Sequence, residues 1–173
     1  MSPFLAKELI STNPSTPSAA PGILVLDEDE EVYDMVQSGV RRRISPPCPI
    51  CWRSDIDDAW ESLEQNGTGI LICDVWLAGR TLKHFIKEVK EFYPHLFILV
   101  ATTYRHNRIL VDLIHHNQID RFFSKPLIYN KLMTTLDAAV RNQRQTPWYI
   151  TPLSEEVRET RHEVLDTRYE VMP

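Results

Sequence analysis

Apolar residues follow two patterns along the chain: short continuous runs, and longer stretches in which they recur every three to four residues. The continuous runs have the length of strands buried on both faces, which need no alternation of apolar and polar residues. They lie at residues 22–26, 49–52, 69–73, 96–101 and 121–124. The pattern therefore predicts five buried strands.

Between these runs the apolar spacing is typical of amphipathic helices, and Ser54 or Asp55 is placed to cap the second of them. The helical faces comprise Val32, Met35, Val36 and Val40; Ile56, Ala59, Trp60 and Leu63; Leu82, Phe85, Ile86 and Val89; Leu110, Leu113 and Ile114; and Leu132, Leu136 and Val140. Strands that alternate with helices form a parallel sheet, because each crossover must pass over the sheet. The predicted fold class is α/β, with a doubly wound sheet of five parallel strands.

The predicted domain occupies residues 22–145, and the flanking segments differ from it in composition. Residues 1–21 are rich in Ser, Thr and Pro and have no sustained hydrophobic period, so we predict a disordered N-terminal tail. Residues 146–173 are interrupted by Pro147 and Pro152. We expect this C-terminal segment to be a linker or a docking tail.

Composition and charge favour a soluble protein of a reducing compartment. Of the 173 residues, 43% are hydrophobic and 25% are charged, and the formal net charge is -5. This acidic balance argues against direct binding to nucleic acid, and no apolar run approaches the roughly 18 residues of a membrane span. Three cysteines, an odd number, argue against a disulfide framework. We therefore expect a cytoplasmic protein that binds neither nucleic acid nor a membrane directly.

Polar side chains follow four of the five predicted strands. Asp27 and Glu28 follow the first strand, Asp74 the third, Thr102 the fourth and Lys125 the fifth. Open parallel sheets bind ligands at the carboxyl ends of their strands, near the point where the strand order reverses. If the first and third strands are neighbours, the three carboxylates converge on one pocket.

Three close carboxylates require compensation. Two unit charges about 4 Å apart repel by about 4 kcal/mol at an effective dielectric constant near 20. Oxygen ligands select a hard divalent cation, so we expect Mg²⁺, with Lys125 as a second compensating charge. Together with the hydroxyl of Thr102, these groups are suited to bind phosphoryl oxygens while a carboxylate attacks the phosphorus.

This ordered set of residues resembles the receiver domain of two-component response regulators over roughly residues 22–145. The resemblance lies in the segments ILVLDEDEEV, LICDVWLAG, ILVATTYR and DRFFSKPL. It implies a flavodoxin-like fold with the strand order 2-1-3-4-5. It also implies a phosphoacceptor rather than an enzyme, with at most self-catalysed phosphorylation and dephosphorylation.

The resemblance also implies a role for each site residue. These roles are Asp74 as phosphoacceptor; Asp27, Glu28, Asp74 and the backbone carbonyl of Trp76 as ligands of Mg²⁺; Thr102 as the switch hydroxyl, with Thr103 as the alternative; Lys125 as the phosphoryl-binding amine; and Phe122 as the switch aromatic. The bond before Pro126 is expected to be cis, as is common in this family.

The sequence departs from the family pattern in three places. Glu28 stands where the family usually has Asp, and its side chain is one methylene longer. The segment VWLAGRTL after Asp74 lacks the usual Pro and Met-Asp-Gly. The segment HNQID stands where the family prefers Gly-Ala, although Asn117 can adopt the left-handed conformation of a helix end.

Two functional hypotheses follow. The first is a signalling switch that a histidine kinase or phosphotransfer protein phosphorylates on Asp74, and that acts through protein–protein contacts, including a homodimer through the fourth and fifth helices. The alternative is a receiver-like interaction module that is not phosphorylated. The CPIC segment from Cys48 to Cys51 has redox or zinc spacing, but no second pair of ligands accompanies it, so we interpret it as structural.

Overall fold

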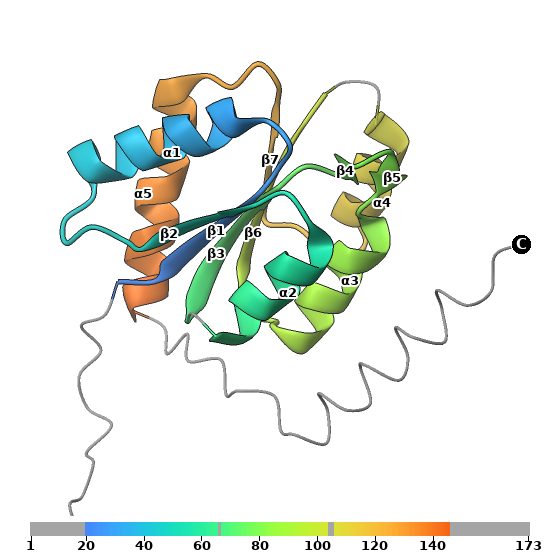
Figure 1. Ribbon diagram of the computed structural model, residues 1–173, viewed down its shortest axis with the longest axis horizontal. Coiled ribbons are helices and arrows are strands. Elements are labelled where there is room, and N and C mark those ends of the chain that lie inside the picture. The colour runs from blue at the N-terminus through green and yellow to red at the C-terminus, as the bar shows by residue number, and fades with distance from the viewer. Residues whose placement is uncertain (1–19, 66, 104–105, 146–173) are drawn as a thin grey trace, which may run out of the picture.

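The computed structural model describes residues 20–65, 67–103 and 106–145, which form a sheet between two layers of helices (Figure 1). The strands of the main sheet are β1 (Gly22–Leu26), β2 (Ile50–Arg53), β3 (Thr68–Cys73), β6 (Phe97–Thr102) and β7 (Arg121–Ser124). Their order is β2-β1-β3-β6-β7, and every neighbouring pair is parallel. The predicted order 2-1-3-4-5 is confirmed, because β6 and β7 are the fourth and fifth strands of this sheet.

In the described residues, four helices connect the strands of the main sheet and a fifth follows the last strand. They are α1 (Glu30–Arg43), α2 (Ile56–Gln65), α3 (Lys83–Phe92), α4 (Asn107–His115) and α5 (Tyr129–Gln145). Helices α1 and α5 cover one face of the sheet, and α2, α3 and α4 cover the other (Figure 1). In the part of the chain that the structure describes, this arrangement gives two hydrophobic cores, one on each side of the sheet.

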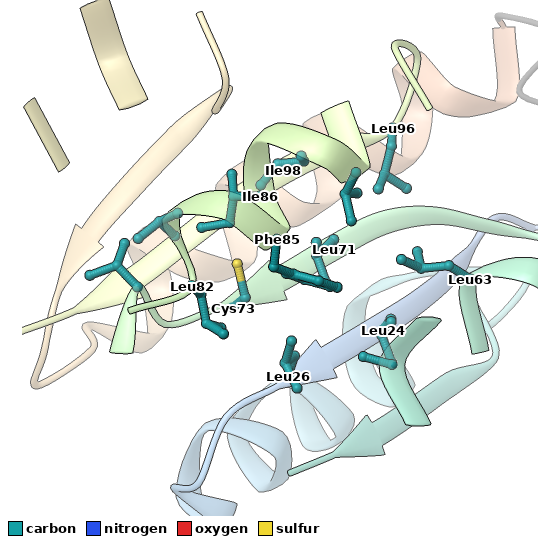
Figure 2. Packing of buried hydrophobic residues seen from close by; sticks show 14 of the residues in the cluster. Leu24, Leu26, Leu63, Leu71, Cys73, Leu82, Phe85, Ile86, Leu96 and Ile98 are labelled. Atoms are coloured by element: carbon teal, nitrogen blue, oxygen red, sulfur yellow. The ribbon is translucent and has the colours of Figure 1, made fainter. Parts of the chain in front are cut away.

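Successive residues of the central strands contribute to opposite cores. In β1, Leu24 packs on the side of α2 and α3, whereas Ile23 and Val25 pack on the side of α1 and α5. Strand β3 alternates in the same way, with Leu71 and Ile72 on opposite sides. Figure 2 shows the first of these cores, in which Leu24, Leu71 and their neighbours are buried. Burial on both faces is why these strands are continuously apolar in the sequence.

The predicted elements agree with the structure to within about one residue at the strand ends, the usual precision of such boundaries. Of the two candidate caps for α2, Asp55 forms a capping hydrogen bond: its Oδ1 accepts a bond of 2.8 Å from the N–H of Asp57. The expectation that Ile114 lies on the buried face of α4 is wrong, because it is 39% exposed. The buried stripe of α4 is narrow and relies on Leu110 and Leu113.

Two details implied by the family resemblance are confirmed. Asn117, directly after α4 and its C-cap His116, has a positive φ of 52°, and the Lys125–Pro126 bond is cis. The Ser45–Pro46 bond is also cis, which the sequence did not indicate.

A short hairpin follows Asp74 and has no counterpart among the predicted elements. Strands β4 (Trp76–Leu77) and β5 (Arg80–Thr81) pair antiparallel. The two turn residues between them, Ala78 and Gly79, have positive φ values of 49° and 76°. Such a turn favours Asn-Gly or Asp-Gly, so Ala-Gly is a weak sequence signal for it.

The CPIC segment is structural in the fold. Cys48 is buried on the side of α1 and α5, whereas Cys51, in β2, packs against the core on the side of α2 and α3. The two thiols therefore belong to opposite sides of the sheet, as expected for side chains that fill two separate cores.

The predicted tails fall almost entirely outside the described residues. The exceptions are Ala20 and Pro21, and Pro21 is buried. The segment 146–173 and its proposed docking role lie outside the description. Within the described ranges, no helix is long and apolar enough to cross a lipid bilayer.

Candidate functional site

Four of the predicted site residues meet at the carboxyl end of the sheet. The Nζ of Lys125 lies 2.9 and 2.8 Å from the two carboxylate oxygens of Asp27, and 2.9 Å from Oδ2 of Asp74. The hydroxyl of Thr102 donates a hydrogen bond of 2.7 Å to Oδ1 of Asp74. Strands β1, β3 and β6 end at this place and β7 ends just before Lys125, so the parallel order of the sheet brings the four side chains together.

Backbone groups fix the orientation of both carboxylates. Oδ1 of Asp74 accepts hydrogen bonds from the N–H groups of Val75, at 2.6 Å, and Trp76, at 3.2 Å. Oδ1 of Asp27 accepts a bond of 2.9 Å from the N–H of Asp29, which in turn caps α1. These bonds leave each carboxylate little rotational freedom at the edge of the sheet.

Burial and unequal charge set the electrostatics of this site. Asp27 is 1% exposed and Asp74 is 8% exposed. Burial raises the pKa of Asp27 above its ordinary value, and the bonds from Lys125 and Asp29 reduce this rise without cancelling it. Burial opposes the charge of Lys125, but its bonds to both carboxylates outweigh burial and raise its pKa. Two carboxylates thus share one ammonium group, and with both ionised the site carries excess negative charge.

Glu28 does not join this cluster. Its side chain is exposed, and its Oε1 accepts a hydrogen bond from the N–H of Ala78 in the turn of the β4–β5 hairpin. The expectation that Asp27, Glu28 and Asp74 converge is therefore met only for Asp27 and Asp74. Among the residues that the structure describes, no group of three His, Cys, Asp or Glu side chains is placed to hold a metal ion.

The remaining predicted residues surround the cluster. Thr102 is buried and bonded to Asp74, whereas Thr103 is exposed, so the structure favours Thr102 as the hydroxyl of the site. Phe122 is half exposed on β7, at the edge of the sheet. Trp76 is 40% exposed, and its ring stacks on His106 with centroids 5.0 Å apart and planes 6° from parallel.

His106 is a site neighbour that the sequence analysis missed. It is the N-cap residue of α4 and lies 30 positions after Trp76 in the chain, so no local pattern links the two. The stack connects the hairpin that follows Asp74 to the beginning of α4.

We expect the replacement of Asp27 by Asn to change how stability depends on pH. The folded-state pKa of Asp27 is raised, so the native state holds its proton more tightly than the unfolded state does. Stability must then fall as pH rises from 3.8, the ordinary value, through the folded-state value. Asp27→Asn should remove this fall. Urea unfolding across the acid range would measure the difference, with Asp34→Asn on the exposed face of α1 as the control. Parallel curves of stability against pH for wild type and Asp27→Asn would contradict this prediction.

Several curated proteins resemble this chain over part of their length. No family model matches it. It is 25% identical over 121 residues to the hydrogenase transcriptional regulatory protein HoxA of Cupriavidus necator. The matched residues cover 70% of this chain and 24% of that protein. It is also 25% identical over 130 residues to the transcriptional regulatory protein ZraR of Salmonella typhimurium. The matched residues cover 72% of this chain and 27% of that protein. The chain spans about a quarter of the length of these relatives.

Solved structures with the same fold include several receiver domains. The signal receiver domain of an HD domain-containing protein from Pseudomonas fluorescens matches with a TM-score of 0.65 and 20% identity, over 77% of this chain and 96% of that chain. The receiver domain of NtrX from Brucella abortus matches with a TM-score of 0.60 and 20% identity, over 70% of this chain and 99% of that chain.

These likenesses show the fold of the domain. It has the α/β flavodoxin-like fold of signal receiver domains. The resemblance to the receiver domain of two-component response regulators, inferred from four sequence segments, is confirmed.

Proposed function

We propose that this domain is a phosphoacceptor in a two-component phosphorelay and that Asp74 is the residue that receives the phosphoryl group. The observation that carries the proposal is the hydrogen-bonded set of Asp74, Lys125 and Thr102. One carboxylate oxygen of Asp74 bonds to the ammonium of Lys125, and the other bonds to the hydroxyl of Thr102. Each donor therefore lies at one of the two carboxylate oxygens, one of which would carry the phosphoryl group.

The reaction proposed for this geometry is a displacement at phosphorus. An oxygen of Asp74 forms the new P–O bond, and the bond between phosphorus and the leaving group breaks. The leaving group takes the bonding electrons: it is the imidazole of a phosphohistidine when a histidine kinase or phosphotransfer protein is the donor, and acetate when acetyl phosphate is the donor. Lys125 and Thr102 then donate to phosphoryl oxygens rather than to the carboxylate, and charge-assisted bonds of this kind are the stronger ones.

A divalent cation suits the donor set. Asp27 and Asp74 together carry one negative charge more than Lys125 neutralises, and a phosphoryl group adds close to two more. Receiver domains generally bind Mg²⁺ at the phosphorylation site. We propose that Asp27, Asp74 and the backbone carbonyl of Trp76 hold Mg²⁺ here, since hard oxygen donors select it. When bound, the ion would neutralise charge on the transferred phosphoryl oxygens.

The proposed output is protein–protein contact, including a homodimer through the fourth and fifth helices. Exposed apolar side chains support it: Val111 and Ile114 on α4 are 50% and 39% exposed, and Phe122 on β7 is 50% exposed. HoxA and ZraR are named as transcriptional regulatory proteins, and this chain matches about a quarter of each. A role of the whole protein in transcription is therefore compatible with the domain, although we propose no direct contact of the domain with nucleic acid.

The alternative, an interaction module that is not phosphorylated, is favoured by one observation. Glu28 bonds to Ala78 and does not join the carboxylate pair, so the acidic cluster is smaller than the sequence suggests. Such a module would dock constitutively through the same exposed surface.

Incubation of the full chain with acetyl phosphate distinguishes the two functions. We expect intact-mass spectrometry to detect one phosphoryl group per chain in the presence of Mg²⁺ and much less after chelation, because the excess negative charge repels the donor. Absence of uptake from both acetyl phosphate and phosphoramidate would favour the non-phosphorylated module instead.

A further inference from the structure

The β4–β5 hairpin begins two residues after Asp74 and is attached to the site on two sides. On one side Oε1 of Glu28 accepts the hydrogen bond from Ala78. On the other side the ring of Trp76 stacks on His106. Between these attachments, Trp76 also donates its N–H to Asp74. The hairpin is therefore part of the surroundings of the phosphoacceptor.

The turn of this hairpin has a donor that the hairpin itself does not use. The ladder pairs Leu77 with Arg80 and Trp76 with Thr81, so the N–H of Ala78 points out of the ladder. Ala78 also has a positive φ of 49°, a conformation that disfavours a residue with a Cβ. The carboxylate of Glu28 accepts from this N–H and stabilises the turn in a conformation that its own sequence disfavours.

We propose that Glu28 is a positioning residue that anchors the β4–β5 hairpin, and that it is not a ligand of the metal ion. By holding Ala78, it keeps the N–H groups of Val75 and Trp76 directed at Oδ1 of Asp74. It also keeps Trp76 in place against His106 at the start of α4. The extra methylene that distinguishes Glu28 from the usual Asp gives the reach that this contact needs.

The anchoring role also lowers the repulsion at the site. With Glu28 bonded to the hairpin, Lys125 has two carboxylates to compensate rather than three. Like charges about 4 Å apart repel by about 4 kcal/mol at an effective dielectric constant near 20, so a third carboxylate in the cluster would add to the repulsion that Lys125 has to compensate.

Three substitutions of Glu28 separate an anchor from a metal ligand, because the two roles predict opposite orders. Gln keeps the length and an acceptor oxygen but loses the charge, so an anchor tolerates Gln and a ligand does not. Asp keeps the charge but is one methylene shorter, so an anchor loses its bond, whereas a metal ligand is retained. Ala removes both functions and serves as the reference for complete loss.

The decisive measurement is hydrogen exchange of the Ala78 amide in the full chain, followed by NMR without metal or phosphoryl donor. We expect Glu28→Gln to exchange within about threefold of wild type, and Glu28→Asp and Glu28→Ala to exchange at least tenfold faster, since a lost hydrogen bond removes protection. Equal exchange in all four proteins, or better protection in Asp than in Gln, would overturn the proposal. Thermal melts of each variant would show that it is folded, as expected for an exposed position.

A Mg²⁺ titration forms the second arm of the test and addresses the proposed function. For an anchor, Glu28→Gln should bind Mg²⁺ about as tightly as wild type. Tighter binding by Glu28→Asp together with a large loss in Glu28→Gln would assign Glu28 to the metal and overturn the proposal. Absence of Mg²⁺ binding in every protein, wild type included, would contradict the proposed metal site, while the amide exchange would still decide the anchor.

Discussion

Asp74→Asn is expected to abolish phosphoryl uptake from acetyl phosphate, whereas Asp29→Asn should leave it unchanged. The amide of Asn retains an oxygen that can accept from Val75, Trp76 and Thr102, so the side chain should keep its orientation. Its NH2 group then replaces the oxygen that faces Lys125, and Lys125 keeps its two bonds to Asp27. A neutral amide oxygen is, however, a much poorer nucleophile than a carboxylate, and this reaction depends on nucleophilic attack. Intact-mass spectrometry of the two variants beside wild type would measure the effect.

Asp29 is a matched control because it lies in the same acidic segment, two residues after Asp27. Its side chain accepts from the N–H of Glu31 and caps α1, a role that Asn also fills well. Loss of uptake in both variants would indicate damage to the acidic edge of the sheet rather than loss of the acceptor. Equal labelling of Asp74→Asn and wild type would move the acceptor to another residue, with Asp27 as the next to test.

The sheet could be predicted because its strands obey a simple physical rule. A strand such as β3 is buried on both faces, so its sequence must be continuously apolar, and the intervening helices must cover both sides. The ends of α4 and the exposure of Ile114 could not be predicted as well. A short helix with two buried leucines has too few apolar positions to define its inward face from the sequence alone.

The meeting of Asp27, Asp74, Thr102 and Lys125 followed from topology. Residues at the carboxyl ends of neighbouring parallel strands share one edge of the sheet, whatever their distance in the chain. The same rule grouped Glu28 with them, and there it failed. Adjacent residues at a strand end point in different directions, and Glu28 accepts a hydrogen bond from the N–H of Ala78 in the hairpin instead.

The β4–β5 hairpin and the stack of Trp76 on His106 depend on contacts that no local sequence pattern indicates. The turn Ala78-Gly79 lacks the Asn or Asp that is typical of such turns, and the two strands that it joins have two residues each. The sequence therefore did not predict the hairpin. The partner of Trp76, His106, belongs to another crossover of the fold. The structure therefore adds to the predicted site the element that connects Asp74 with α4.

Lys125→Met is expected to destabilise the fold by about 3 kcal/mol at neutral pH, since removal of one partner from a buried ion pair leaves the other charge uncompensated. Methionine preserves the length of the side chain and most of its apolar packing. The cost arises because Asp27 and Asp74, whose side chains are 2% and 12% exposed, then face each other without a cation. Urea unfolding without metal would measure it, with Lys131→Met on the exposed side of α5 as the control.

Two further measurements identify carboxylate repulsion as the cause. A second substitution, Asp74→Asn, should recover much of the stability that Lys125→Met loses, because one of the two charges is removed. Acidification should also reduce the loss: burial already raises the pKa of Asp27, and removal of its partner must raise it further, so the proton binds at a higher pH. A loss of stability that is the same in acid and at neutral pH, and that Asp74→Asn does not reduce, would instead attribute the effect to packing around the lysine side chain.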